Sequence, residues 1–453
     1  MPITIPSFKA YDVRGRLPDE LNEDIAHRIA NATAQFLDAK RVVIGRDIRL
    51  SSETLADAVT AGLVEAGVEV LDIGLGGTEM VYFGTGALGA DGGIMITASH
   101  NPKDYNGLKI VRDAARPISG DTGLADIRAF AERDERLVAA MPGKRTPVDI
   151  RADYVAHLLS YVDISALKPL KIVVNAGNGG AGAVLDQLEP HLPFEFIKIN
   201  HEPDGTFPNG VPNPMLTENR AATAEAVRAH GADLGIAWDG DFDRCFFFDE
   251  RGDFVEGYYI VGLLAQSLLA ANPGGGVVHD PRLRWNTVEI VSDNGGRVIQ
   301  SKSGHSFMKE VMREENAVYG GEMSAHHYFR EFYYCDSGMV PWLLVAELIG
   351  SQGQPLSAQV AARIDRFPAS GEINRRVDDA QAVMDRIWAE YEPDSVTSDT
   401  VDGISVAFED WRFNLRASNT EPVIRLNVES RGDVTLMQRK TEELLGQIGG
   451  DAA

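Results

Sequence analysis

The feature that most constrains the fold is a regular alternation between short apolar segments and longer amphipathic segments. A helical pattern covers roughly residues 22–37, and residues 42–45 then predict a strand. Ser51 and Ser52 are typical of a helix N-cap, and residues 69–73 predict the next strand. Strands that alternate with helices in this way indicate an α/β domain.

The same alternation continues along a chain that is too long for one ordinary domain. Its 453 residues are 44% hydrophobic, which is enough for several cores. We therefore expect about three or four domains. Turn-forming segments at 141–147, 249–252 and 368–371 mark the boundaries. The predicted domains are 1–145, 146–250, 251–367 and 368–453, the last being a small α+β unit.

A polar loop follows the apolar segment 93–96. Such a run predicts a buried strand that ends at the carboxyl edge of a sheet, where open α/β sheets bind ligands. Ser99 has His100 beside it and Lys109 shortly after, which is the minimum that covalent catalysis on a hydroxyl requires. A simple polar turn is the alternative, because Ser, Asn and Pro are common turn residues.

Three aspartates alternate in the segment DGDFDR, directly after a predicted strand at 232–238. Asp239, Asp241 and Asp243 would repel one another if they met without a cation, and a hard divalent metal resolves that conflict. Arg244 stands where an EF-hand needs glycine, so a catalytic magnesium loop is favoured, with a solvated acidic turn as the alternative. Magnesium commonly shares its ligand shell with phosphate oxygens, so the segment points to phosphoryl chemistry.

Other loops offer groups that suit a phosphorylated sugar. The segment RASNTEP can surround a phosphate, with an ordinary β-turn as the alternative; its candidate ligands are Arg416, Ser418, Asn419 and Thr420. Glu322 and Ser324 suit sugar hydroxyls, although a structural salt bridge is the rival for Glu322. His305 precedes a helical pattern, where anions bind, and helix capping by the adjacent serines explains that segment equally well.

The charge balance limits the possible partners. With 67 acidic and 43 basic residues, the net charge of -24 opposes binding to nucleic acid or to an anionic membrane. An anionic ligand then requires basic residues gathered in the site, and the candidates are Arg14, Lys109, Arg244 and Arg282. Cys245 and Cys335 lack disulfide or zinc-site spacing, and no signal peptide or membrane span is predicted. A cytoplasmic location is expected.

A short repeat connects two of the predicted domains. Residues 47–50 and 280–283 both read D-x-R-L, and both follow a predicted strand. The match hints at a repeated structural unit.

Five motifs occur in the order found in one enzyme superfamily. They are YDVRG at Tyr11, TASHNP at Thr97, DGDFDR at Asp239, GEMSAHHY at Gly321 and RASNTEP at Arg416. Together they resemble the α-D-phosphohexomutase superfamily over essentially the whole chain, and GEMSAHHY and HDPRLRW look closest to bacterial phosphomannomutases. The resemblance implies an α/β fold with three similar mixed-sheet α/β domains around a central cleft, plus a smaller C-terminal α+β domain that closes over it.

The resemblance also implies a reaction. Phospho-Ser99 would give its phosphoryl group to a hexose monophosphate, and the resulting hexose 1,6-bisphosphate, which is also the activator, would return its other phosphate to Ser99. One Mg2+ per chain would be held by a phosphoserine oxygen and by the three aspartates. The implied activity interconverts mannose 6-phosphate and mannose 1-phosphate, in a monomer or weak homodimer.

Individual roles follow from the same resemblance. Lys109 is the predicted general base and acid, with its pKa lowered by neighbouring cations such as Arg14, while Arg244 supplies positive charge and His100 supports the loop. Glu322 and Ser324 would hold sugar hydroxyls. The other substrate-binding predictions are Arg416, Ser418, Asn419 and Thr420 on the non-reacting phosphate, with Tyr11, Arg282, His305 and His326 nearby.

Three residues depart from the family pattern: Phe242 leaves the three aspartate ligand positions in place, whereas Ala325 and Arg282 bear on the sugar preference rather than on the reaction type. Phe242 and Ala325 stand where glycine is frequent, and Arg282 replaces a lysine of some relatives. The alternatives are therefore a phosphoglucomutase or a dual-specificity mutase. A magnesium-dependent phosphatase with Asp239 as nucleophile, and a non-catalytic phosphosugar sensor, are the rival classes.

Overall fold

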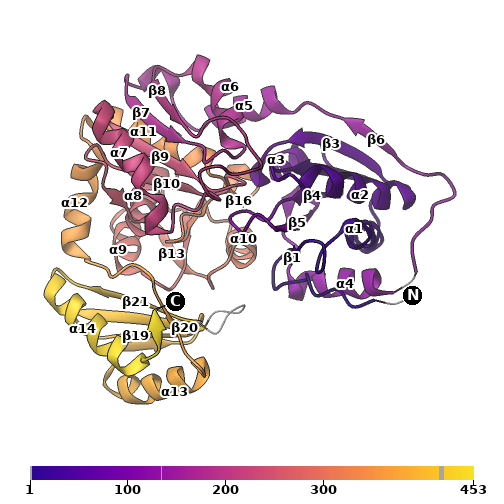
Figure 1. The fold of residues 1–453 in the computed structure, drawn as a ribbon. Helices are drawn as coiled ribbons and strands as arrows, with labels where there is room; N and C mark the ends of the chain where they lie inside the picture. Colours follow the sequence, from indigo (N-terminus) through magenta and orange to yellow (C-terminus); the bar gives the residue numbers. More distant parts are fainter. Residues whose placement is uncertain (1–2, 134, 418–422, 453) are drawn as a thin grey trace. The chain divides into compact units, whose positions relative to one another are not determined.

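The computed structural model describes residues 3–133, 135–417 and 423–452 (Figure 1). The chain forms two compact units, Met1–Phe254 with Tyr328–Gly353, and Val255–His327 with Gln354–Ala453. Among the described residues, no helix combines the length and apolar character that a bilayer span requires.

The N-terminal part of the first unit is built on one mixed sheet of order β1-β5-β4-β2-β3-β6. Strand β2 is parallel to both β3 and β4, whereas β5 is antiparallel to β4 and to β1. The strands are β1 (Val13–Arg16), β2 (Arg41–Arg46), β3 (Glu69–Leu75), β4 (Gly92–Ile96), β5 (Tyr105–Arg112) and β6 (Lys144–Pro147). The helices are α1 (Glu23–Leu37), α2 (Ser52–Glu65), α3 (Thr78–Ala87) and α4 (Leu124–Glu132).

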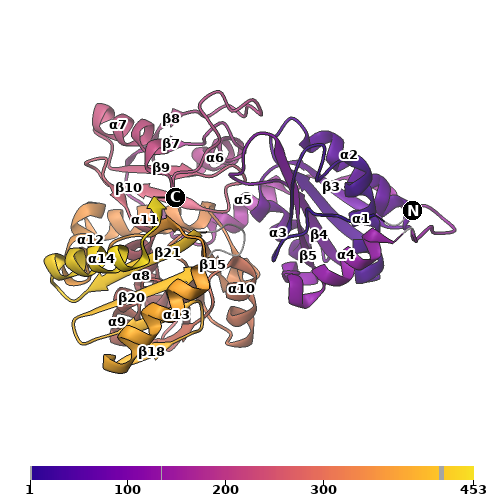
Figure 2. The same ribbon diagram turned by 60° about the horizontal axis from the view of Figure 1, so that its bottom comes forward.

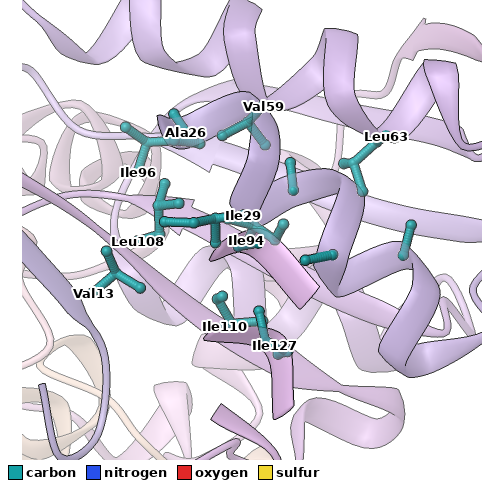
Figure 3. Close-up of a cluster of buried hydrophobic side chains, with 14 of the residues drawn as sticks. Val13, Ala26, Ile29, Val59, Leu63, Ile94, Ile96, Leu108, Ile110 and Ile127 are labelled. Atoms are coloured by element: carbon teal, nitrogen blue, oxygen red, sulfur yellow. The ribbon is translucent and has the colours of Figure 1, made fainter. Parts of the chain in front are cut away.

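Alternating side chains of these strands supply two apolar cores, because successive residues of a strand face opposite sides of the sheet. Ile94, Ile96, Leu108 and Ile110 lie in the core shared with α1, α2 and α4 (Figure 3). Met95 and Val43 face the other side, where they pack against Val81 of α3. Helices on both faces make this an α/β/α layer structure, with the ends of β2 and β4 at one edge of the sheet.

Two helices of this domain begin where the sequence predicts, but only one of them has a side-chain hydrogen bond at its N-cap. The Asn22 side chain accepts a hydrogen bond from Ile25 N and caps α1. Ser51 stands at the N-cap of α2 as predicted, although its side chain makes no capping hydrogen bond. Ser51 Oγ accepts from Asn106 Nδ2 instead, and Ser52 Oγ donates to Asp47.

The next part of the first unit forms a second mixed sheet. Strand β7 (Lys171–Asn175) is parallel to β8 (Glu195–Ile199) and to β9 (Leu234–Trp238), and β10 (Cys245–Phe248) is antiparallel to β9. Helices α5 (Arg151–Leu159), α6 (Ala181–Leu188) and α7 (Ala221–His230) belong to this part. Figure 2 shows these elements grouped around the sheet. The same unit contains β16 (Cys335–Asp336), which pairs antiparallel with β15 (His327–Phe329), and α11 (Met339–Gln352).

The second unit contains a parallel set in which β12 (Gly276–His279) lies between β13 (Arg297–Gln300) and β14 (Tyr319–Gly321). Its other strands form an antiparallel sheet of order β18-β19-β20-β21-β17-β22. Those strands are β17 (Ile373–Arg376), β18 (Thr397–Asp399), β19 (Ile404–Ala407), β20 (Trp411–Ala417), β21 (Val423–Ser430) and β22 (Asp451–Ala452). The helices are α8 (Gly257–Ala271), α9 (Trp285–Asp293), α10 (His305–Glu314), α12 (Leu356–Arg366), α13 (Ala380–Tyr391) and α14 (Val434–Ile448).

The antiparallel sheet has one apolar face and one polar face. Val406, Phe413 and Leu426 pack with α13 and α14 in one core. Arg412, Asn414, Asn427 and Glu429 alternate with those residues along β20 and β21 and are also buried. Arg416 and Arg425 lie opposite one another across these two strands, in phase with the polar residues.

Candidate active site

Ser99 lies in the loop that follows β4 and is almost completely buried, with an exposed fraction of 1%. Its Oγ donates a hydrogen bond to Asp239 Oδ2 at 2.9 Å and lies 3.0 Å from His100 Nδ1. Its backbone N–H donates to Thr97 Oγ at 2.9 Å. The backbone of Ser99 has φ +50°, a left-handed conformation that a non-glycine residue adopts only when its surroundings hold it there.

The three aspartates gather in the turn between β9 and β10. Asp239, Asp241 and Asp243 are buried, and each offers a carboxylate oxygen within 4.8 Å of the other two. Asp241 Oδ1 and Asp243 Oδ1 have no hydrogen-bond partner among the described residues. Buried carboxylate oxygens without donors are suited to a hard cation, so the donor set fits a divalent metal such as magnesium.

Close backbone contacts hold this turn against its neighbours. A Cβ on Gly240 would lie 2.6 Å from the carbonyl oxygen of Ser99. The ring of Phe242 fills the space beside Gly77 and Gly180, where a Cβ would lie 2.4 Å and 2.9 Å from ring atoms. Phe242 itself has φ +44°, which accounts for the frequent glycine at this position.

The pKa values of Asp239 and Asp241 are shifted in opposite directions. Burial raises the pKa of Asp239 to about 6, and Asp243 and Asp241 add to that effect while Arg244 opposes it. For Asp241, burial works to raise the pKa, but contact with Lys109 outweighs it and the net direction is downward. The site therefore contains carboxylates of very different proton affinity within a few ångströms.

Lys109 projects from β5 into this turn, and its pKa is shifted in the direction opposite to the one predicted. Its Nζ lies 2.7 Å from Asp241 Oδ2 and 2.5 Å from Asp243 Oδ2. Burial and Arg14 act to lower the pKa of Lys109, but the two carboxylates outweigh them, so the pKa is raised. The prediction of a lowered pKa was wrong because it considered the neighbouring cations and not the aspartates that contact the ammonium group.

The other basic candidates of the first unit surround the same loop. Arg244 Nε donates to Asp239 Oδ2 at 3.0 Å, and its Nη2 contacts His100 Nδ1. Arg14, on β1, donates to Asp12 at 2.7 Å and to Asn101 at 2.6 Å. Burial, and then Arg244 and Arg14, hold the pKa of His100 well below its usual value, so the imidazole is neutral. Tyr11 is half-buried just before β1.

The sugar-binding candidates of the second unit form a connected cluster. Arg282 Nη2 lies 3.3 Å from Glu322 Oε1 and 3.2 Å from Ser324 Oγ, and it donates to Asp280 Oδ2 at 2.9 Å. Glu322 also accepts from Gly304 N at 2.8 Å, at the start of α10. The salt-bridge alternative for Glu322 therefore describes a real contact, with Arg282 as the partner. Ala325 has φ +68°, which accounts for the glycine often found there.

Sequence reasoning missed the residue at the centre of the neighbouring basic group. Glu372 lies 3.5 Å from Arg282 Nη1, 3.0 Å from Arg416 Nη2 and 3.6 Å from Arg425 Nη1. Three guanidinium groups around one carboxylate form an anion-binding arrangement. Glu372 and Arg425 have no motif of their own, and only the cross-strand register of β20 and β21 could have indicated Arg425.

The remaining candidate residues are His305, His326 and the three polar residues that follow β20. His305 is the first residue of α10, and neither Ser303 nor Ser306 caps that helix with its side chain. His326 is half-buried and lies next to β15. The candidates Ser418, Asn419 and Thr420 lie outside the described residues.

Four domain families cover nearly the whole chain. They are the phosphoglucomutase/phosphomannomutase α/β/α domains I, II and III at residues 6–137, 152–252 and 256–367, and the C-terminal domain at 372–445. The chain therefore belongs to the phosphoglucomutase/phosphomannomutase family, which makes it an intramolecular phosphotransferase of the isomerase class. The predicted fold class, three α/β domains followed by a C-terminal domain, is confirmed.

Individual relatives are similar over their full lengths. A protein of Xanthomonas campestris pv. campestris (strain B100) described as phosphohexose mutases is 61% identical over 448 residues, which cover 99% of this chain and 100% of the relative. A phosphomannomutase of Escherichia coli is 58% identical over 449 residues, or 97% of this chain and 98% of the relative. The crystal structure of a phosphoglucomutase/phosphomannomutase family protein from Burkholderia thailandensis matches with a TM-score of 0.89 and 30% identity, over 100% of this chain and 99% of that chain.

Proposed function

We propose that this chain is a phosphomannomutase that interconverts mannose 6-phosphate and mannose 1-phosphate through phospho-Ser99 and a hexose 1,6-bisphosphate. The observation that carries the proposal is the position of Ser99 Oγ, 2.9 Å from Asp239 in the buried aspartate turn. A hydroxyl held beside a cation-binding carboxylate group and between basic side chains suits phosphoryl transfer, which depends on positioning and charge neutralisation.

The proposed cofactor is one Mg2+ per chain, held by Asp239, Asp241, Asp243 and an oxygen of phospho-Ser99. When bound, the metal would supply positive charge to the oxygens of the transferring group. The unpartnered Asp241 Oδ1 and Asp243 Oδ1 support this assignment, and so does the all-oxygen donor set that the three described aspartates provide.

In the first half-reaction, a hydroxyl of the hexose monophosphate attacks the phosphorus of phospho-Ser99. The new sugar O–P bond forms while the Ser99 Oγ–P bond breaks, and the second half-reaction reverses these roles with the other phosphate of the bisphosphate. Lys109 would carry the mobile proton: its ammonium group, buried beside the aspartates, gives a proton to the departing Ser99 Oγ and takes one from the attacking sugar hydroxyl. Arg244 and Arg14 balance negative charge, and neutral His100 orients the Ser99 loop.

All the proposed substrate ligands except Tyr11, which belongs to the first unit, lie in the second unit. Glu322 and Ser324 would bind sugar hydroxyls. Arg416, with Ser418, Asn419 and Thr420, would bind the phosphate that does not react, and Tyr11, Arg282, His305 and His326 complete the proposed set. The three arginines around Glu372 support an anion site in this unit.

We further propose domain limits of 1–145, 146–250, 251–367 and 368–453, carrying the phosphoserine, metal, sugar and phosphate-binding loops in that order. The enzyme would act in the cytoplasm as a monomer or weak homodimer, without nucleic acid or membrane as partner. The net charge of -24 supports that choice of partners. Hexose 1,6-bisphosphate would serve as activator as well as intermediate.

Peptide mass spectrometry tests the covalent step. After incubation with Mg2+ and glucose 1,6-bisphosphate, the wild-type peptide containing Ser99 should gain one phosphate, and Ser99→Ala should neither gain it nor turn over sugar phosphate. Ser51→Ala, at another serine on the same sheet edge, should behave like the wild type. Turnover by Ser99→Ala, or a phosphoaspartate at Asp239 with net hydrolysis, would reject the mutase proposal.

Coupled assays with mannose 1-phosphate and glucose 1-phosphate separate the sugar alternatives. A larger kcat/KM for the mannose compound is expected. Equal values would indicate a dual-specificity mutase, and a larger value for glucose 1-phosphate would overturn the preference but not the class of reaction.

A further inference from the structure

Arg49 is a buried arginine whose side chain is directed at the backbone of the Ser99 loop. Its Nη2 donates to the carbonyl oxygens of Ser99 at 2.8 Å and of Asn101 at 2.6 Å. Its Nη1 donates to the carbonyl oxygens of Pro102 at 2.7 Å and of Tyr105 at 2.9 Å. These four bonds use all four Nη protons of the guanidinium group and bind both ends of the turn between β4 and β5.

Asp47 fixes both Arg49 and the start of the same loop. Its Oδ1 accepts from Arg49 N at 3.0 Å and from Ser52 Oγ, and its Oδ2 accepts from Thr97 Oγ at 2.7 Å. Thr97 Oγ in turn accepts from Ser99 N at 2.9 Å. Asp47, Arg49, Thr97 and Ser99 therefore form one continuous network of buried polar groups.

The network acts directly on the backbone conformation of Ser99. The carbonyl of Ser99 that Arg49 binds is the same one that packs against Gly240 of the aspartate turn. Ser99 has φ +50°, and a residue keeps such a conformation when the groups around it over-determine it. Fixing the carbonyl oxygen fixes the peptide plane that follows Ser99, and so it fixes the position from which the side chain reaches Asp239.

We propose that Arg49 is a positioning residue for phosphoryl transfer, which holds the backbone of the Ser99 loop so that the serine oxygen faces the aspartate turn. This inference rests on the proposed role of Ser99 and extends it to a residue outside the reacting groups. Lysine cannot replace arginine here, because an ammonium group has three donors on one atom and cannot span four carbonyls.

The second D-x-R-L turn supports a positioning role. Residues 47–50 follow β2, and residues 280–283 follow β12; β2 is parallel to β4 as β12 is parallel to β14. In each turn the aspartate accepts from the arginine backbone N–H, Asp47 from Arg49 and Asp280 from Arg282. Each arginine then reaches the loop after the neighbouring strand. Arg49 contacts the backbone of the Ser99 loop, and Arg282 contacts the side chains of Glu322 and Ser324.

The packing around Arg49 is consistent with a fixed guanidinium. Its exposed fraction is 3%, and the guanidinium carbon lies 5.6 Å from the ring centroid of Phe207. Burial lowers the pKa of Arg49 and Asp47 raises it, and arginine remains charged throughout the physiological range.

Arg49→Lys and Arg49→Met test the proposal, with Arg228→Met as the matched control. Arg228 also donates to two backbone carbonyls, those of Arg251 at 2.8 Å and Gly252 at 3.0 Å, but it lies on α7, outside the Ser99 and aspartate loops. The measurements are kcat, KM, the single-turnover rate of Ser99 phosphorylation by glucose 1,6-bisphosphate, and the midpoint temperature of unfolding.

Both Arg49 variants should lower kcat and the phosphorylation rate by about 100-fold, with KM changed by about threefold or less, since loss of alignment slows chemistry more than binding. Arg228→Met should keep both rates within about twofold. An Arg49→Lys variant that is folded and phosphorylates Ser99 at the wild-type rate would overturn the proposal. A wild-type enzyme that never forms phospho-Ser99 would instead reject the proposed function, so the two failures are distinguishable.

Discussion

At the scale of single residues, Lys109 is a side chain that offsets negative charge of the aspartate turn. Its ammonium group contacts Asp241 and Asp243, and so it neutralises two of the three carboxylates proposed to hold the metal. The lysine and a divalent cation would therefore act on the same two carboxylates, the lysine through the Oδ2 atoms and the cation through the Oδ1 atoms that have no hydrogen-bond partner among the described residues. The stability of the turn should depend on one or the other being present.

Lys109→Met should therefore lower the unfolding temperature in the absence of metal and increase the stabilisation by Mg2+. Turnover should fall by about 100-fold or more, because the proton carrier is lost. Thermal unfolding measured without Mg2+ and with about 10 mM Mg2+, a concentration that exceeds a weak Kd, tests the first effect. Lys198→Met is the control, since Lys198 also contacts two carboxylates, Asp186 at 2.7 Å and Glu189 at 2.6 Å, outside the site. A metal response equal to that of the control would contradict this role of Lys109.

Arg416→Ala should weaken binding of the sugar phosphate by about 10- to 100-fold, the cost of one or two charge-assisted hydrogen bonds. Mg2+ affinity should stay within about twofold, because the described ion pair of Arg416 is with Glu372, whereas the proposed metal ligands are the three aspartates of the turn between β9 and β10. Titration calorimetry with each ligand measures both effects. Arg386→Ala, which removes an exposed arginine of the same C-terminal domain, is the control. Equal losses for sugar phosphate and metal would count against the phosphate-binding role.

At the scale of elements, the reacting groups depend on how closely two turns approach. The Ser99 loop and the aspartate turn meet backbone to backbone at Gly240, where no side chain can be accommodated without movement. The contact distance is therefore set by the absence of a Cβ at one position.

Gly240→Ala should move the two turns apart and lower kcat by at least about 10-fold, because its Cβ would lie 2.6 Å from the Ser99 carbonyl oxygen. Gly446→Ala is the control: it lies within α14 with no other atom within 4 Å of its Cβ position, and it should raise stability by about 0.5–1 kcal/mol. The single-turnover rate of Ser99 phosphorylation reports the displacement. A wild-type rate in Gly240→Ala would show that the contact is not needed.

Helices, strands and motifs were predictable where they depend on residues that are close together in the sequence. The alternation of apolar and helical segments placed α1 within one residue of its observed limits, and strand ends located Ser99 and the three aspartates. The strand expected at 232–238 begins two residues later, at Leu234, because residues 232 and 233 precede the first pair of β9 with β7.

Contacts between distant parts of the chain were not predictable in the same way. The pKa direction of Lys109 depends on carboxylates that are 132 and 134 residues away in sequence. Glu79 and Glu372 carry no motif, and the partners of these two residues and of Arg49 are segments that only the folded chain brings together. The repeated D-x-R-L letters gave the one local hint of Arg49.

At the scale of the whole molecule, Glu79 joins three segments of the first unit. It lies on α3, accepts from Tyr154 of α5 and Ser337 Oγ at 3.0 Å, and accepts from the N–H groups of Gly338 and Met339 at the start of α11. Burial raises the pKa of Glu79 to about 8, although these donors oppose the shift. The neighbouring residue, Thr78, contacts Asp241, so the same helix start serves both the fold and the site.

The raised pKa has a definite sign for stability. The folded state binds the Glu79 proton more tightly than the unfolded state, so its contribution is fully present below about pH 4.5 and is lost as the pH rises towards 8. Glu79→Gln should flatten this part of the profile by up to about 1.4 kcal/mol per pH unit. Denaturant unfolding from pH 5 to 8 measures it, and Glu225→Gln, on an exposed position of α7, is the control. Parallel profiles for wild type and Glu79→Gln would show that the donors keep the carboxylate ionised.

The paired D-x-R-L turns have a consequence for how such an enzyme can diversify. The arginine of one copy, Arg49, donates only to main-chain carbonyls of its target loop, so it constrains the shape of that loop and does not depend on the side chains at those four positions. The arginine of the other copy, Arg282, contacts the side chains of Glu322 and Ser324, so any change in these proposed sugar ligands alters what the arginine can reach. Selection for new sugars should therefore alter the copy near residue 282 and leave the copy near residue 49 untouched.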